Sequence, residues 1–180
     1  MPTIFSHAVF AAAIGRAAFD KTVSRFLGIL VGGCAMMPDS DVIFAALTGA
    51  PRGSMFAHRG FTHSIFFAAS FGAIVAFFAA RFLKTNVSFL KLFVLFALAT
   101  FTHPLLDMLT DGGSGVALLA PFSNERFFFP FRPVEVSPIG FGFFTERGWT
   151  VIQSEFVWLW LPSIGVLIAA TFLRRRRRKN

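Results

Sequence analysis

The chain has 180 residues, enough for one domain of ordinary size. Hydrophobic residues make up 55% of it and charged residues only 14%, whereas a soluble domain carries about 25% charged residues. A mean hydropathy of +0.67 agrees with this imbalance. The composition excludes a disordered, collagen-like or disulfide-stapled protein and predicts a small integral membrane protein.

The net charge of +8 comes mostly from the end of the chain. Six of the 17 basic residues lie in Arg174–Lys179, and the other 11 nearly balance the nine acidic residues. A polybasic run directly after an apolar segment is typical of a cytoplasmic membrane anchor. We therefore expect a polybasic cytoplasmic tail over residues 174–180 and no nucleic-acid partner.

The chain begins with two short apolar segments, Met1–Gly15 and Phe26–Pro38, on either side of a polar turn at 16–25 that holds three basic residues. A secretory signal peptide has its positive charge before the apolar stretch and not after it. We expect a helical hairpin that crosses the membrane or dips deeply into it. Gly32 and Gly33 would let its helices approach closely.

Three longer uncharged segments follow at Ser64–Ala80, Leu92–Leu106 and Phe156–Leu173. A helix rises about 1.5 Å per residue and the bilayer core is about 30 Å thick, so each segment can span or nearly span the membrane. The predicted fold is an all-α, polytopic membrane helix bundle of about four or five membrane helices. It forms one domain over residues 1–173.

Residues 111–153 are expected to form a long loop at the membrane interface. They hold four of the nine prolines, many glycines, and aromatic clusters at 127–131 and 141–144. Basic residues gather instead at 16–25, at 81–91 and in the tail, and the positive-inside rule assigns these three places to the cytoplasm. With five crossings, the N-terminus and the 39–63 and 111–153 connections then face the outer side, despite the arginines found there.

All four histidines of the chain fall on this outer side, together with three aspartates that flank the same segments. Scattered along the sequence, the seven side chains are expected to gather at one end of the bundle: His7, Asp39, Asp41, His58, His63, His103 and Asp107.

Each part of this set alone has a structural explanation. The 38–41 element fits a turn with an aspartate helix cap, and 58–63 fits an interfacial loop with Thr62 or Ser64 as the helix N-cap. His103 and Asp107 lie four residues apart, on one helix face, and could stabilise packing. Ionisable side chains at membrane depth are costly, however, and they indicate function by default.

Together these residues predict a metal site. Mixed histidine and aspartate ligands suit a divalent cation, zinc first and manganese as the alternative. One ion needs three or four protein ligands, so seven candidates suggest two ions. Two ions about 3.5–4 Å apart are a common arrangement for hydrolysing phosphate esters.

Arg59 and Asp41 are the candidate catalytic residues. The guanidinium of Arg59 can hold phosphate oxygens in a bidentate manner; alternatively, Arg59 only anchors its loop to lipid headgroups. No Gly-x-Ser-x-Gly element and no glycine-rich phosphate loop is present. The single cysteine, Cys34, lies in an apolar stretch and is expected to be inert packing.

The chain resembles a known family in the order of its polar motifs. The residues that carry the resemblance are His7, Pro38–Asp41, His58–Ser64, His103–Asp107, and Gly112 with Pro121–Ser123. They are similar to those of the proposed membrane-bound metal-dependent hydrolases of the YdjM type, also described as LexA-binding, inner-membrane-associated hydrolases. The resemblance implies a multi-pass protein of the bacterial inner membrane with metal-dependent hydrolase activity.

A more distant resemblance concerns the fold of zinc-dependent phospholipase C and single-strand nucleases, which are all-α enzymes that cleave phosphodiesters. The matching positions would be His7, Asp39 or Asp41, His58 or His63, and His103 with Asp107. No histidine follows His103, so the later ligand helix of that fold has no counterpart. The resemblance therefore implies one or two metal ions instead of three.

Two functions from different classes remain open at this point. One is hydrolysis of a phosphate ester or phosphodiester, including a phospholipid whose headgroup passes sideways from the leaflet through the aromatic 117–144 region. The other is a non-enzymatic scaffold or regulator-binding partner with a structural metal. A structural zinc site is closed by four protein ligands, whereas a catalytic site keeps a position for water.

Overall fold

The computed structural model describes the chain except for residues 20–24, 84, 139 and 178–180. Its α-helices are α1 (Ile4–Phe19), α2 (Arg25–Met36), α3 (Asp41–Thr48), α4 (Ile65–Phe82), α5 (Phe89–Met108), α6 (Glu146–Glu155) and α7 (Leu161–Arg177). Short turns of other helix types are η2 (Met37–Ser40), η3 (Phe61–His63), η4 (Gly140–Phe144) and the π-helical η5 (Phe156–Trp160).

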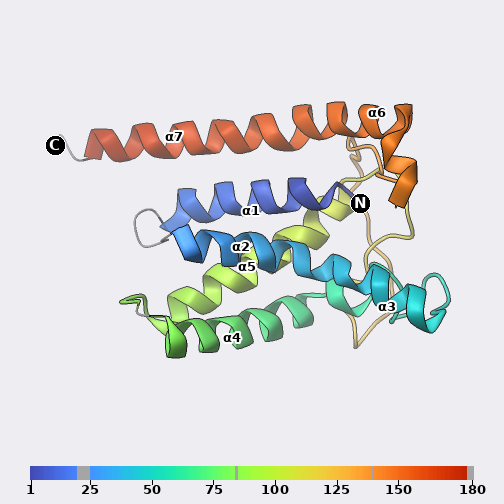
Figure 1. The fold of residues 1–180 in the computed structure, drawn as a ribbon, viewed down its shortest axis with the longest axis horizontal. Coiled ribbons are helices and arrows are strands. Elements are labelled where there is room, and N and C mark those ends of the chain that lie inside the picture. The colour runs from blue at the N-terminus through green and yellow to red at the C-terminus, as the bar shows by residue number, and fades with distance from the viewer. Residues whose placement is uncertain (20–24, 84, 139, 178–180) are drawn as a thin grey trace.

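The long helices lie side by side (Figure 1). α1 and α2 form an antiparallel pair, α4 and α5 form another, and α2 packs against α5 to join the two pairs. α7 lies along the outside and packs against α1. Small side chains such as Ala76 on α4 and Ala99 on α5 are buried in the core, which lets the helices approach closely.

Four stretches are long and apolar enough to cross a membrane: Phe26–Thr48, Ile65–Phe82, Phe89–Met108 and Glu146–Arg176. The first runs from α2 through η2 into α3, so it is longer than the segment expected from the sequence. α1 has 16 residues and is about 24 Å long, which is short of a full crossing. The predicted all-α polytopic bundle is confirmed.

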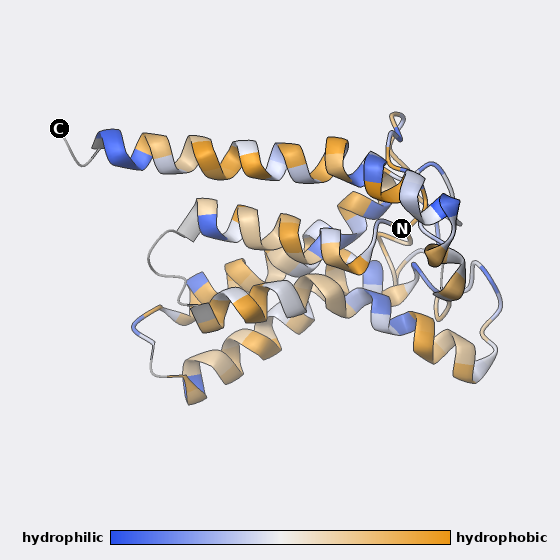
Figure 2. Cartoon of the chain, turned by 45° about the horizontal axis from the view of Figure 1, so that its top comes forward, coloured by the Kyte–Doolittle hydropathy of each residue, from blue (hydrophilic) through white to orange (hydrophobic). Residues whose placement is uncertain are grey.

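The outer surface of these helices is apolar. Figure 2 shows hydrophobic residues over most of the bundle and hydrophilic ones concentrated toward its ends. Large side chains such as Phe78, Phe82 and Ile168 are more than half exposed. An exposed apolar surface of this extent would be unstable in water, and a bilayer would cover it.

The two ends of the bundle differ. α1, α4 and α7 end, and α2 and α5 begin, at one end of the bundle (Figure 1). The N-terminus, the 49–64 connection and the described residues of the 111–145 connection lie at the other end. The described basic residues at these helix ends, such as Arg16, Arg25, Arg81 and Lys91, therefore lie away from the aspartates and histidines of the candidate site, as the sequence predicted.

The 111–145 connection folds back over the end of α5. Isolated β-bridges join Thr110 to Val134 and Val116 to Phe127, and Ala117 N donates a hydrogen bond to Arg59 O. The loop was expected to extend to residue 153, but α6 already begins at Glu146. Residues 146–153 thus belong to the last membrane-spanning stretch.

Candidate metal centre

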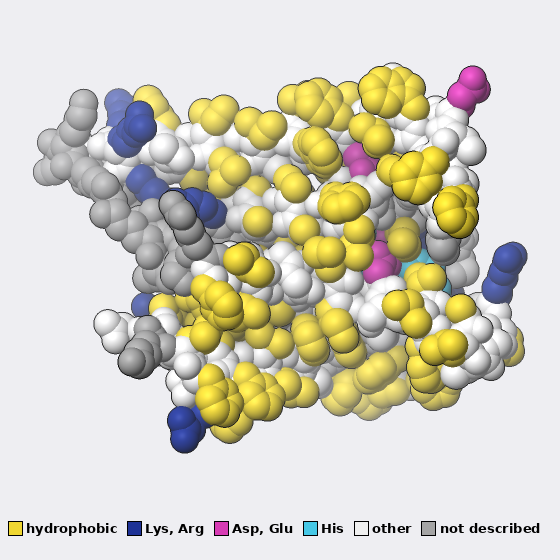
Figure 3. All heavy atoms as spheres, viewed as in Figure 1, with side chains coloured by type: hydrophobic (Ala, Val, Ile, Leu, Met, Phe, Trp, Pro, Cys, Tyr) yellow, Lys and Arg dark blue, Asp and Glu magenta, His cyan; other side chains and the backbone are white. Residues whose placement is uncertain are grey.

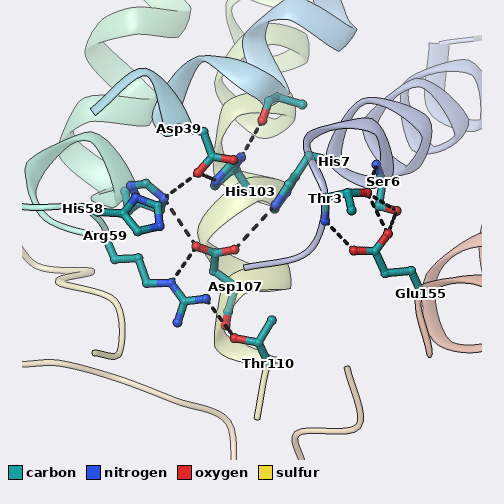
Figure 4. Close-up of polar contacts among 12 residues, drawn as sticks. Thr3, Ser6, His7, Asp39, His58, Arg59, His103, Asp107, Thr110 and Glu155 are labelled. Atoms are coloured by element: carbon teal, nitrogen blue, oxygen red, sulfur yellow. Dashed lines mark hydrogen bonds and ion pairs between the residues drawn. The ribbon is translucent and has the colours of Figure 1, made fainter. Parts of the chain in front are cut away.

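Side chains from four separate parts of the chain meet beside the end of α5 (Figure 4). α5 supplies His103 and Asp107, which lie on one face because they are four residues apart. Asp39 comes from η2 and His63 from η3, and all four side chains are buried. His7 reaches the same place from α1.

The four buried side chains of Asp39, His63, His103 and Asp107 face a common centre. One nitrogen or oxygen atom from each lies within 4.8 Å of the others. His103 Nε2 is 3.2 Å from Asp39 Oδ1, and His63 Nε2 is 3.4 Å from Asp107 Oδ2. Two imidazoles and two carboxylates within this distance form a compact set of nitrogen and oxygen donors.

Both histidines are held so that Nε2 points to the centre. His103 Nδ1 lies 2.6 Å from Ala35 O, and because a carbonyl only accepts, Nδ1 carries the proton. His63 Nδ1 lies 3.1 Å from Asp41 Oδ2, which fixes this ring in the same way. A histidine whose Nδ1 donates to a carbonyl or carboxylate presents the Nε2 lone pair, which is the usual state of a metal ligand.

The centre contains polar atoms that no described residue satisfies. His63 Nε2, His103 Nε2, both carboxylate oxygens of Asp39 and Asp107 Oδ1 are buried without a hydrogen bond, whereas Asp107 Oδ2 forms an ion pair with Arg59 Nε. Buried polar groups are almost always hydrogen-bonded, and unpaired ones are costly. Lone pairs that converge from two imidazoles and two carboxylates fit a divalent cation, so these residues meet the requirement for a metal site.

The pKa of His63 also indicates an excess of negative charge at the centre. Burial lowers the pKa of His63, but its contacts with Asp107, Asp39 and Asp41 outweigh burial and hold that pKa well above the ordinary value. The carboxylates therefore attract a positive charge to the Nε2 position. A cation at the centre would supply it.

His7 is a fifth potential ligand. Its ring stacks on that of His103 with centroids 3.6 Å apart, and its Nε2 lies 3.5 Å from Asp107 Oδ1. Neither ring nitrogen of His7 has a hydrogen-bond partner among the described residues, and the side chain is fully buried.

Asp41, His58 and His63 form a second group with donor atoms near one another. Asp41 Oδ1 contacts His58 Nδ1 at 2.7 Å, whereas Asp41 Oδ2 accepts from Thr62 Oγ1 and from Arg59 N. This group shares His63 with the first one, and both oxygens of Asp41 already have partners. His58 is therefore held by Asp41 beside the centre.

Arg59 is 1% exposed and lies next to Asp107 of the centre. Its Nε lies 3.1 Å from Asp107 Oδ2, and its two terminal nitrogens donate to Thr110 Oγ1 and Gly112 O. Its backbone has φ +65°, a left-handed conformation that a residue other than glycine rarely adopts. The side chain of Arg59 is therefore held by a buried ion pair and two hydrogen bonds within the protein.

Two glycines make room for this arrangement. A Cβ on Gly60 would lie 2.1 Å from Met55 O, so a side chain cannot fit in the tight turn between Arg59 and η3. A Cβ on Gly113 would lie 2.5 Å from Arg59 Nη1. At the end of the same turn, Ser64 is the N-cap of α4 because its hydroxyl accepts from Phe67 N, one of the two caps the sequence allowed.

Glu155 takes part in the site indirectly, and the sequence pointed to it only as the boundary of an apolar segment. Its buried carboxylate accepts hydrogen bonds from the Thr3 backbone, from Thr3 Oγ1 at 2.7 Å and from Ser6 Oγ at 2.6 Å (Figure 4). Ser6 also accepts from Trp160 Nε1. These bonds fix the first turn of α1 immediately before His7.

A cavity of about 500 Å³ lies beside Arg59, and we call it the polar cavity because Arg52, His58, Arg59 and Ser114 are among its lining residues. None of the four buried donors is among the described residues that line it. Arg59 and His58 thus lie between the cavity and the buried donors. Arg126 supports this wall because it donates to Arg59 O and Ser54 O.

The chain is similar to known inner-membrane proteins over nearly its whole length. The family model described as YdjM inner membrane protein matches residues 1–177. The Inner membrane protein YbcI of Escherichia coli (strain K12) is 36% identical over 181 residues, which cover 98% of this chain and 100% of the relative. No solved structure matches. Taken with its four apolar spans, the chain is a multi-pass protein of the inner membrane, and it belongs to the YdjM inner membrane protein family.

Proposed function

We propose that this protein is a metal-dependent hydrolase that cleaves a phosphate ester or phosphodiester. The observation that carries the proposal is the buried centre, where the Nε2 atoms of His63 and His103 face two carboxylates, and neither Nε2 atom and neither oxygen of Asp39 has a hydrogen-bond partner among the described residues. Nothing in the packing of an apolar bundle requires this set, because it is costly unless a cation completes it.

The donors would hold one divalent cation. His63 and His103 would supply nitrogen, Asp39 and Asp107 oxygen, and His7 is within reach as a fifth ligand. Zinc suits this set, and manganese is the alternative. Since the second group shares His63 and its Asp41 oxygens are already hydrogen-bonded, the geometry favours one ion over two.

Adjoining cavities favour a catalytic over a structural site. A structural metal is enclosed by its protein ligands, whereas a catalytic one stays open to a water or substrate. Here Asp39, one of the four donors, lines a cavity of about 350 Å³, so the donors do not fully enclose the centre. The polar cavity lies on the other side of Arg59 and His58. A non-enzymatic scaffold with a structural metal would not need a cavity at this place.

A divalent cation bound at this centre supplies Lewis acidity and a bound water of lowered pKa. Arg59 holds a phosphoryl oxygen: a guanidinium has five N–H groups, and the contacts to Asp107, Thr110 and Gly112 engage three of them. His58 Nδ1 is bound to Asp41, so Nε2 is the atom at which His58 takes up or delivers a proton.

Hydrolysis by purified protein tests the proposal. The substrates are p-nitrophenyl phosphate, bis(p-nitrophenyl) phosphate and a phospholipid panel in detergent. Activity should disappear with EDTA, return with zinc or manganese, and be lost in Asp107→Asn. Glu125→Gln, which makes the same carboxylate-to-amide change on an exposed loop, should remain active. Hydrolysis that survives both chelation and Asp107→Asn, or a metal-loaded protein inactive on the whole panel, would overturn the proposal.

A further inference from the structure

A second cavity lies beside the polar one, and its walls are mostly apolar. It measures about 350 Å³ and is bounded by the first turn of α1, by α3, and by Ser137, Pro138, Gly140 and Phe143. Ile4, Phe5, Val42 and Phe143 contribute to its walls. Asp39 is the only charged side chain among the described residues that line it, and Asp39 also belongs to the buried centre. The apolar cavity therefore leads to the proposed metal site.

The opening of this apolar cavity lies on the side of the helix bundle and not at its end. Phe5 on α1 and Ile43 on α3 line it and are 67% and 66% exposed. Ile43 belongs to the membrane-spanning stretch Phe26–Thr48. Figure 3 shows acidic and histidine side chains at the bottom of a recess in this otherwise hydrophobic face. An opening at this level would meet the hydrocarbon or the interface of the bilayer and not bulk water.

The two cavities are neighbours that differ in the charged side chains among their lining residues. Both are lined by Met1 and Ser137, which are joined by a hydrogen bond from Ser137 N to Met1 O. The polar cavity has Arg52, His58 and Arg59 in its lining and no carboxylate among the described residues. The polar cavity therefore suits an anion, and the apolar cavity suits a hydrocarbon chain.

We propose that the substrate is a phosphate-bearing lipid that enters sideways from the bilayer. Its chain occupies the apolar cavity beside Val42 and Phe143, and its phosphate faces Arg59 in the polar cavity. The inference rests on the proposed hydrolase function and names its substrate class. A water-soluble phosphodiester would use only the polar cavity and would leave the apolar one, with Asp39 at its base, without an occupant.

Photo-crosslinking measures this binding without turnover. The protein is reconstituted in nanodiscs of phosphatidylethanolamine and phosphatidylglycerol that contain a phosphatidylethanolamine with a diazirine in its acyl chain. We expect adducts on the peptides that carry Ile4–Phe5 and Val42–Ile43. A diacylglycerol with the same diazirine lacks the phosphate and should label these peptides about tenfold less, the ratio that one hydrogen bond to a charged group supplies.

Variants on α3 distinguish adducts formed by lipid inside the cavity from adducts formed by the lipid that surrounds the protein. Val42→Trp, or the smaller Val42→Phe, fills the cavity and should reduce these adducts about tenfold. Ala46→Trp is the matched control, because Ala46 is exposed on the same helix outside the cavity lining. Its adducts should equal those of the unmodified chain.

The outcomes distinguish this inference from the hydrolase proposal. Equal labelling by the phosphate-bearing and phosphate-free probes, or unchanged labelling in both Val42 variants, overturns the lipid route even if a soluble phosphodiester is hydrolysed. Phosphate-dependent cavity labelling in a protein that hydrolyses nothing supports the lipid site and overturns the enzyme.

Discussion

Asp41 acts on the centre indirectly, through the two histidines that it contacts. One of its carboxylate oxygens contacts His58 and the other contacts His63, so a single side chain orients both rings of the 58–63 segment. Thr62 and the backbone of Arg59 donate to it as well. Sequence alone placed Asp41 among the ligands and the catalytic residues, because spacing does not distinguish a ligand from a residue that orients one.

Replacing Asp41 with asparagine tests this orienting role. The amide side chain would offer one acceptor oxygen in place of two, so the rings of His58 and His63 cannot both be held. Loss of such an outer-shell partner typically lowers metal affinity by about 10–100-fold. Asp41→Asn should therefore still bind zinc, weakly, in competition with a chromophoric chelator. Binding as weak as in Asp107→Ala would instead make Asp41 a direct ligand.

Arg59 carries a separate prediction. Arg59→Lys keeps the positive charge next to Asp107 but loses the planar fork of donors. Metal content should stay unchanged while kcat falls by about 10²-fold, the cost of losing one preorganised donor to a developing oxyanion. Metal content and turnover are measured on the same preparation. Full activity in the Arg59→Lys variant would contradict the proposal that Arg59 holds phosphate, but it would not contradict the metal site.

At the scale of elements, α4, α5 and α7 could be predicted because most of each helix is a long run without charge. The stretch Phe26–Thr48 continues past Asp39 and Asp41, so its full length could not be predicted in this way. The convergence of the histidines and aspartates could also be predicted, since alternating crossings bring every second connection to the same end. The role of Glu155 and the apolar cavity could not. Both depend on where α1 lies against its neighbours, and contacts between residues as distant as Thr3 and Glu155 leave no periodic pattern in the sequence.

Glu155 offers a test at this scale. It precedes the π-helical turn Phe156–Trp160 and receives the hydrogen bonds of the first turn of α1. Glu155→Gln removes the negative charge and one acceptor, so the first turn of α1 should loosen and His7 should leave the centre. We expect faster amide hydrogen exchange over residues 3–7 and weaker metal binding.

Glu146→Gln is the control for that experiment, because Glu146 is exposed at the start of the same helix. It should leave exchange in α1 unchanged. Slow exchange over residues 3–7 in Glu155→Gln, equal to that of the unmodified chain, would show that α1 is held without this carboxylate.

At the scale of the whole molecule, the distribution of charge predicts the orientation in the membrane. Arg16 and Arg81 lie in the last turns of α1 and α4, and these helices end at the end of the bundle opposite the site (Figure 1). Basic residues favour the cytoplasm. A reporter fused after Lys179 should therefore be cytoplasmic, and one inserted within residues 111–145 should be external. A cytoplasmic loop reporter would reverse the orientation, although the donors would still share one end.

The central claim is that the buried histidines and aspartates bind a divalent cation, and the metal content of the purified protein tests it most directly. Inductively coupled plasma mass spectrometry should find about one zinc or manganese ion per chain, as a single site requires. His103→Ala and Asp107→Ala should each lower that content, whereas Cys34→Ser, which alters a buried residue in the apolar core, should not. A metal-free protein after zinc and manganese loading, or equal metal content in all three variants, would contradict the account.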